Sequence, residues 1–187
     1  LEGGKLSTSR NWAVWLPDYL ERYQADPLRY YLSASMPETS DSEFSWRDYV
    51  RRNNDELVAT YGNLVHRVLT FTYRNFSRQV PQPGELAQED KALLSRAQAA
   101  LQEVDESLHG CRFREALRSV MGLAREANRY LDFQAPWKIL EKDRARCATV
   151  LWTAIAAISC LRVITYPFMP FSSQKLHALL GFPGTLE

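Results

Sequence analysis

The chain has 187 residues, of which 45% are hydrophobic and 24% charged, and its net charge is +1 at pH 7. This length suits one globular core, or one core with a small appended module. The balanced charge excludes a strongly basic nucleic-acid coat and an acidic disordered tail, so any nucleic-acid site must be a local patch. The three cysteines are far apart and odd in number, which predicts reduced core residues of a cytoplasmic protein and no metal site.

The first 45 residues are predicted to form a loop-rich module with two short helices. The start "LEGGK" has neither an initiator Met nor a signal peptide, which predicts a piece of a longer protein. Pro17 suits the first turn of "LPDYLERYQ". Asp26 is predicted to cap "PLRYYLSASM", with Pro27 at the first helical position. The polar connector "PETSDSEFSW" follows, with a brief strand predicted at residues 43–45.

The rest of the chain has the apolar periodicity of helices. Apolar residues recur at intervals of three, four and seven, which predicts helices over residues 46–76, 88–108, 113–133, 145–165 and 170–180. The breaks between them are "SRQVPQPGE", a glycine after "LQEVDESLH" and the tetrapeptide "QAPW". The predicted fold is all-α: an antiparallel helical bundle over residues 46–187, preceded by the small module of residues 1–45.

The most apolar stretch begins at Cys147 with "CATVLWTAIAAISCLRVITYPFMPF". It is long enough to be considered as a membrane span. Because Arg162 interrupts it and Pro167 follows, the sequence favours a buried core helix.

The first candidate site is the loop "GGKLSTSR", residues 3–10. Its glycines expose backbone N–H groups, and its lysine, arginine and hydroxyls are the donors that a polyphosphate needs. The G-x-x-x-x-G-K spacing of a P-loop is absent. From the residues alone, an ordinary solvated loop is the commoner interpretation of such a segment.

The second candidate site combines Asn63 and Arg67 with Trp137. Asn63 and Arg67 are four residues apart and therefore share one helix face. An amide and a planar guanidinium can bond the edges of unpaired RNA bases, which also stack on aromatic rings. Trp137 follows Pro136, which predicts a helix start where the ring is partly exposed. The alternatives are a solvated polar pair and a tryptophan that anchors the core.

Four segments, taken in order, resemble one protein family. "KLSTS" resembles the KMSKS signature of class I aminoacyl-tRNA synthetases. "ADPLRYYL" resembles the segment that follows this signature in methionyl-tRNA synthetases, and "GNLVHR" and "NRYLDFQAPW" resemble two helical segments of their anticodon-binding bundle. The short loop is weakly specific alone, but four ordered matches over nearly the whole chain are strong.

The resemblance implies roles for the loop residues. In the family the loop closes over ATP, with Mg in the parent enzyme, and stabilises the pyrophosphate leaving group by preorganised electrostatics. By position these roles fall to Lys5, Ser7, Thr8 and Ser9. The resemblance implies that residues 1–45 together are the KMSKS loop and stem-contact module. The second lysine of the motif is Thr8 here, whose hydroxyl does not neutralise phosphate, so Lys5 or Arg10 is expected to supply the cation. No cofactor is expected to bind the fragment, which lacks the nucleotide-binding fold and is expected to be inactive alone.

The resemblance also assigns the helical residues. Asn63, Arg67 and Trp137 match the residues that read the CAU anticodon in this family, chiefly its first base. Arg74, seven residues beyond Arg67, is a weaker candidate for a phosphate contact. The implied partners are the anticodon loop of tRNA-Met and the upstream catalytic domain of the parent, with neither a membrane nor DNA. Two alternatives remain: another class I synthetase (for leucine, isoleucine, valine or cysteine) and a non-catalytic helical interaction module.

Overall fold

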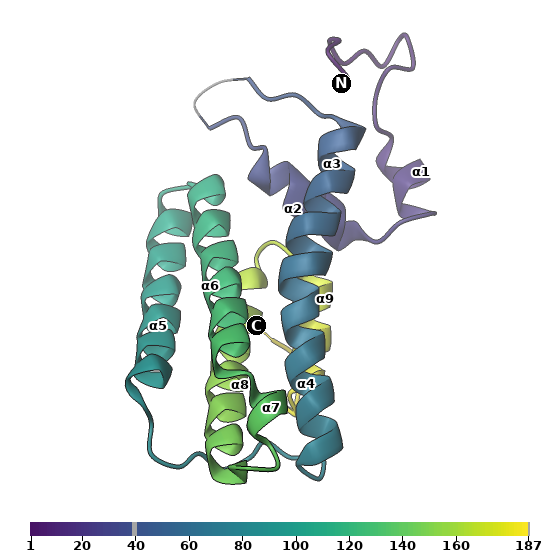
Figure 1. The fold of residues 1–187 in the computed structure, drawn as a ribbon. Coiled ribbons are helices and arrows are strands. Elements are labelled where there is room, and N and C mark those ends of the chain that lie inside the picture. The colour runs from purple at the N-terminus through teal and green to yellow at the C-terminus, as the bar shows by residue number, and fades with distance from the viewer. Residues whose placement is uncertain (39–40, 187) are drawn as a thin grey trace.

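The computed structural model describes residues 1–38 and 41–186, so the middle of the predicted polar connector lies outside the described residues. Within these ranges the regular structure is helical and contains no strand (Figure 1). The elements are α1 (Leu16–Leu20), α2 (Ala25–Ala34), α3 (Trp46–Arg52), η1 (Asn53–Gly62), α4 (Asn63–Asn75), α5 (Gln88–His109), α6 (Phe113–Gln134), α7 (Pro136–Ile139), α8 (Arg144–Thr165) and α9 (Pro170–Leu179). The predicted all-α helical bundle is confirmed.

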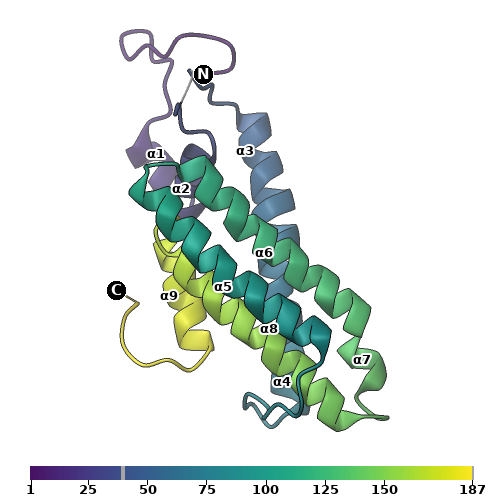
Figure 2. The same cartoon turned by 90° about the vertical axis from the view of Figure 1, so that its left-hand side faces the viewer.

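The bundle forms because the long helices each bury one apolar stripe against their neighbours. Helices α5, α6 and α8 pack on one another, and α3, η1 and α4 form one continuous column beside α6 (Figure 1). In the turned view, α7 lies at the end of α6 that is far from α1, α2 and the N-terminus (Figure 2). The fully buried side chains at the centre come from several helices and include Leu64, Val68, Leu123, Leu131, Leu151, Ile158 and Leu161.

The apolar helix α8 is a core helix, as predicted. By length and composition alone it could cross a membrane, but 78% of its most apolar window is buried inside the bundle. Its buried threonine hydroxyls bond the backbone of the same helix, as when Thr153 donates to the carbonyl of Thr149 at 2.9 Å. Arg162, the charge that interrupts the apolar run, bonds the ring nitrogen Nδ1 of His177, and its guanidinium lies 4.1 Å from the Phe182 ring centroid.

The central part of the long column is a π-helix rather than an α-helix. At its end the backbone N–H of Asn63 reaches the carbonyl of Val58, five residues back, and within η1 the side-chain hydroxyl of Thr60 also donates to the carbonyl of Asp55 at 2.7 Å. A Cβ at Gly62 would lie only 3.0 Å from the carbonyl oxygen of Leu57. The glycine of "GNLVHR" therefore allows the wide turn to close tightly before α4 begins.

Two local predictions about exposure and pairing are wrong. Residues 43–45 do not form a strand, because the Phe44 carbonyl accepts a single backbone hydrogen bond, from Glu2 at 2.9 Å, and no ladder follows. Cys111 is exposed rather than part of the core. It lies in the tight turn between α5 and α6, where its φ is 53°, and this turn projects from the bundle end.

The start of α2 also differs from the prediction. The N-cap is Gln24, and Asp26 lies inside the helix, so Pro27 is the third helical residue rather than the first. The buried Asp26 instead accepts a hydrogen bond from the backbone N–H of Ser172 at 2.6 Å, which ties α2 to the start of α9. Pro17 does stand in the first turn of α1, as predicted.

Candidate nucleic-acid interface

Arg67 on α4 and Trp137 on α7 meet on one surface of the bundle. The Arg67 guanidinium carbon lies 4.8 Å from the centroid of the Trp137 ring, a cation–π contact. Ala135, with φ 41° and ψ 59°, turns the chain sharply between α6 and α7. Pro136 then starts α7, so Trp137 stands in its first turn with 42% of its surface exposed. The position predicted for Trp137 is therefore the observed one.

Asp132 on α6 orients the Arg67 side chain. Nη2 of Arg67 donates to Oδ1 of Asp132 at 2.7 Å, and the two side chains are 29% and 64% exposed. An exposed ion pair of this kind adds little stability. Its effect is geometric, because one of the five guanidinium donors is engaged while the planar group lies beside the Trp137 ring.

Between the long column and α6 runs an open groove of about 590 Å³. Asn63 and Arg67 line one side of it, and its full lining is Ala59, Thr60, Asn63, Arg67, Gly122, Arg125, Glu126, Asn128, Arg129 and Asp132. Asn128 holds the two walls together, since its amide donates to the Thr60 carbonyl on η1 and to the Ala124 carbonyl on α6, each at 3.0 Å. Sequence reasoning missed Asn128, because nothing local marks a bond between distant segments.

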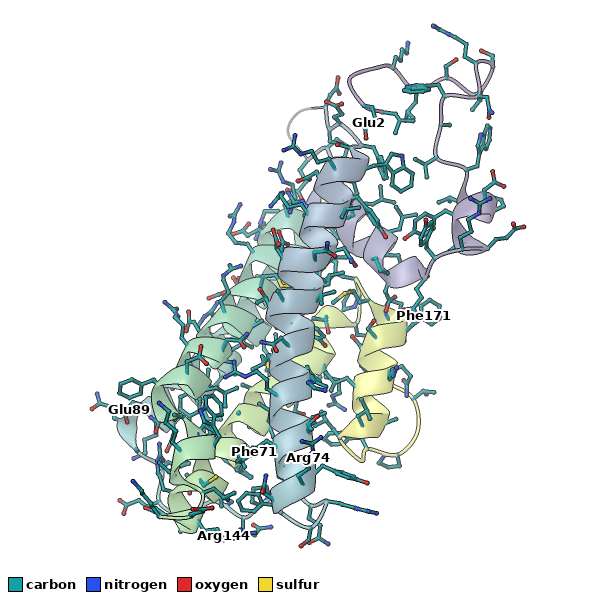
Figure 3. All side chains as sticks on the ribbon, turned by 45° about the vertical axis from the view of Figure 1, so that its right-hand side comes forward. Glu2, Phe71, Arg74, Glu89, Arg144 and Phe171 are labelled. Atoms are coloured by element: carbon teal, nitrogen blue, oxygen red, sulfur yellow. The ribbon has the colours of Figure 1, made fainter. Side chains whose placement is uncertain are left out.

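The Asn63 amide is exposed at this groove and, within residues 1–38 and 41–186, makes no hydrogen bond of its own. It therefore keeps both donor and acceptor atoms for a ligand. Arg74 lies about 10 Å further along the α4 axis than Arg67, near the C-terminal end of the helix (Figure 3). Arg74 is exposed and does not line the groove, so the structure does not bring it together with the other three predicted residues.

An exposed aromatic residue near the groove was also missed. Phe133 is 75% exposed at the end of α6, directly after Asp132. The signal was present in the sequence, because Phe133 falls outside the apolar periodicity that buries Leu123, Ala127 and Leu131. An aromatic residue off the buried stripe of a helix is a candidate contact residue.

A buried ion pair supports the end of the bundle from which α7 projects. The Asp90 carboxylate on α5 receives two bonds from the Arg146 guanidinium on α8, at 2.5 and 2.8 Å, and one from the Tyr130 hydroxyl. Arg146 also donates to the side-chain oxygen of Gln134, the last residue of α6, at 2.9 Å. Burial alone would raise the pKa of Asp90, but the bonds from Arg146 and Tyr130 outweigh it and hold this pKa below its ordinary value.

The N-terminal loop forms a tight turn at the opposite end of the molecule from α7 (Figure 1). Ser7 and Trp12 exchange backbone hydrogen bonds of 3.0 and 2.8 Å, and the Ser7 and Ser9 hydroxyls lie 3.2 Å apart. Lys5, Thr8 and Ser9 are exposed around this turn. In the described part of the chain neither Lys5 nor Arg10 has an ion-pair partner, so the turn offers two cations beside three hydroxyls.

Comparison with known protein families places the chain among class I aminoacyl-tRNA synthetases. Residues 1–69 match the family model described as tRNA synthetases class I (M), and residues 80–185 match the anticodon binding domain of methionyl tRNA ligase. Because the second match covers more than half of the chain, the chain belongs to the methionyl-tRNA ligase anticodon-binding family.

Individual relatives agree with this family. The methionine–tRNA ligase of Roseiflexus sp. (strain RS-1) is 52% identical over 186 residues, and that of Dehalococcoides mccartyi (strain ATCC BAA-2266) is 56% identical over 187 residues. Each match covers 100% of this chain but 31% and 34% of the relative, so the chain spans about a third of their length. Mycobacterium tuberculosis methionyl-tRNA synthetase in complex with methionyl-adenylate has a TM-score of 0.91 at 31% identity, covering 97% of this chain and 36% of that one.

Proposed function

We propose that this chain is the part of a methionine–tRNA ligase that runs from the ATP loop through the anticodon-binding bundle. In this proposal residues 1–45 form the ATP loop and a stem-contact module, and residues 46–187 bind the CAU anticodon loop of tRNA-Met. One observation carries the proposal: Arg67 lies against Trp137, one helical turn from the exposed amide of Asn63, at an open groove. The parent enzyme joins methionine to its tRNA at the expense of ATP, and the fragment alone lacks the catalytic fold.

The three side chains suit an unpaired cytosine. The half-exposed Trp137 ring offers a stacking surface, and the groove beside it admits the edge of the stacked base. Cytosine presents an amino donor and carbonyl and ring-nitrogen acceptors. The amide oxygen of Asn63 accepts from the amino group, while the remaining N–H groups of Arg67 donate to the acceptors. Asp132 fixes the direction of those N–H groups before the base arrives.

An RNA titration tests this assignment. We expect the full-length enzyme to bind a stem-loop with the CAU anticodon more tightly than one with another first anticodon base. The expected difference is about 1 to 3 kcal/mol, the range for a bidentate contact to a base edge. Asn63→Ala is expected to abolish the preference, whereas Lys175→Gln, a change of an exposed residue on α9, is expected to keep it. Equal affinity of the unmodified enzyme for the two RNAs would contradict specific reading.

The N-terminal turn is proposed to hold the phosphates of ATP when the upstream catalytic domain is present. Two exposed cations and three hydroxyls form a donor set that fits a polyphosphate. Lys5 and Arg10 would neutralise charge on the leaving pyrophosphate, and Ser7, Thr8 and Ser9 would donate hydrogen bonds.

A substitution separates the two cations of the turn. In the full-length enzyme, Lys5→Ala is expected to lower the rate of ATP–pyrophosphate exchange about a hundredfold, as for the loss of one preorganised donor. Lys175→Ala serves as the control, because it removes an exposed lysine from α9, outside the turn. An unchanged rate in Lys5→Ala would exclude Lys5 from this role and leave Arg10 as the cation.

The exposed apolar surface of residues 1–45 supports an upstream catalytic domain as the second partner. Its large apolar side chains in contact with solvent are Leu6, Trp12, Trp15, Leu16, Leu20, Tyr23, Leu32 and Met36. A surface of this kind is usually covered by a partner. The family match favours this enzyme over the leucine, isoleucine, valine and cysteine alternatives and over a non-catalytic helical module. We place the enzyme in the cytoplasm, with neither a membrane nor DNA as a partner.

A further inference from the structure

Four arginines form a stripe along the exposed side of α6. Arg114, Arg118, Arg125 and Arg129 are all exposed. At 100° per residue they fall within about 60° around the helix axis and extend about 22 Å along it. Figure 2 shows α6 running from the N-terminal elements α1 and α2 to α7, so the stripe follows the long axis of the bundle.

The stripe carries an excess of positive charge. Among residues 1–38 and 41–186, no carboxylate forms an ion pair with the guanidinium groups of Arg114, Arg118 or Arg125, although the Glu38 carboxylate accepts a bond from the backbone N–H of Arg114 at 2.9 Å. Arg129 has only a 3.9 Å contact with Glu126, and Glu126 also lies 3.6 Å from Arg96. Asp132, the next acidic residue on this side of α6, is engaged by Arg67. The chain as a whole is nearly neutral, so this local excess of charge stands out from its surroundings.

The arginine stripe adjoins the open groove that Asn63 and Arg67 line. A second cavity of about 210 Å³ lies further toward the N-terminal elements, and its lining includes Arg52, Arg114, Arg118 and Arg125. Arg125 also lines the groove that contains Asn63 and Arg67. In the second cavity the one carboxylate is Glu56, which already accepts bonds from Tyr30 and Arg52. A cationic path therefore leads away from the proposed base-reading residues along α6.

We infer that this stripe binds the phosphate backbone of the anticodon stem, an inference that rests on the proposed function. With the anticodon loop held at the α7 end, the rest of the tRNA must extend toward the N-terminal turn that is proposed to hold ATP. This turn lies at the opposite end of the molecule (Figure 1). A stem leaving the groove in that direction runs beside α6. Guanidinium groups bind phosphates in bidentate fashion and without regard to sequence, so they position a duplex without reading it. In this proposal the stripe orients the tRNA on the bundle, and the groove selects the tRNA by its anticodon.

The test measures how the affinity of the full-length enzyme for tRNA depends on salt. Removing one arginine that neutralises a phosphate is expected to reduce the slope of log Kd against log salt concentration by about 1. The Arg114→Gln, Arg118→Gln double variant, whose two positions do not line the groove of Asn63 and Arg67, should therefore lower the slope by about 2. It should weaken binding of the CAU stem-loop and of the altered stem-loop equally, and its thermal unfolding should match that of the unmodified enzyme. Lys175→Gln removes the same unit charge from α9, which packs mainly on α8 and α2, and should leave the slope unchanged.

The length of the stem provides a second arm. With a stem cut to its loop-proximal base pairs, Arg114→Gln and Arg118→Gln should lose their effect, whereas Arg129→Gln should keep it. An unchanged slope in the double variant, with the preference for CAU intact, would contradict phosphate binding by the stripe. The base-reading proposal would still stand. Equal binding of the CAU and altered stem-loops by the unmodified enzyme would overturn the base-reading proposal instead. A double variant that also lost the preference for CAU would show a disturbed groove and would likewise overturn the stripe as a separate element.

Discussion

Replacing Trp137 by alanine in the full-length enzyme is expected to weaken binding of the CAU stem-loop by about 1 to 3 kcal/mol, the range for one stacked base. The indole is 42% exposed on a one-turn helix, and Arg67 lies over its ring. Removing it takes away the stacking surface and the partner that flanks the guanidinium. Fluorescence polarisation of a labelled stem-loop measures the loss directly.

Two variants separate stacking from packing. Trp137→Phe retains an aromatic face and should recover most of the affinity. Phe171→Ala removes a side chain that is 69% exposed on α9, on the far side of α4 from α6 (Figure 3), and should leave binding unchanged. If Trp137→Ala bound RNA normally but unfolded at markedly lower urea concentration, Trp137 would be a packing residue and the stacking role would be wrong.

Replacing Asp90 by alanine is expected to lower the free energy of unfolding by about 3 to 5 kcal/mol, as for a buried ion pair broken at one partner. Asp90 has no solvent exposure and is bonded by Arg146, Tyr130 and the backbone N–H of Ala87. Within the described part of the chain, its loss leaves Gln134 as the side-chain partner of the Arg146 guanidinium. Urea unfolding followed by circular dichroism measures the change.

The pH dependence of stability provides an independent measurement for the same residue. The pKa of Asp90 is held below its ordinary value of 3.8, so the carboxylate stabilises the fold above about pH 4. That contribution is lost as pH falls through the lowered pKa. The acid-side decline in stability should therefore be shallower in Asp90→Ala.

Two further variants serve as controls for the size of the stability loss in Asp90→Ala. The exposed pair Arg112–Glu115 is half-solvated, so Glu115→Ala should cost far less than Asp90→Ala. The combined Asp90→Ala, Arg146→Met variant should be more stable than Asp90→Ala alone, because it removes the unpaired charge. A loss for Asp90→Ala no larger than that for Glu115→Ala would contradict a structural role for the buried pair.

Periodicity predicted the bundle helices closely. The predicted ranges 88–108 and 113–133 end within one residue of α5 and α6, because an amphipathic stripe of this length has no competing pattern and Gly110 and Pro136 mark the ends. The π-helical section was not predicted. Its carbonyls pair five residues along rather than four, and the apolar residues around it still recur at helical spacing, so the sequence carries no distinct signal.

The candidate site was predictable only in part. The shared face of Asn63 and Arg67 follows from their spacing, but the meeting of Arg67 with Trp137 and Asp132 depends on how α4 packs beside α6 and α7. The arginine stripe of α6 was not predicted for a different reason. The near-zero net charge concealed it, although the periodicity used for apolar residues would have shown it if applied to arginine.

The unbroken helix from α3 through η1 to α4 makes the direction of the Asn63 and Arg67 side chains sensitive to insertions and deletions. Each residue turns an α-helix by about 100°. The wide turns that Gly62 permits therefore determine the direction in which Asn63 and Arg67 point around the helix axis. One residue more or fewer in η1 would swing both side chains away from α6 while hardly changing the length of the rod. The orientation of the two proposed base-reading side chains therefore depends on the number of residues in η1, and we expect η1 to tolerate side-chain substitutions better than insertions or deletions.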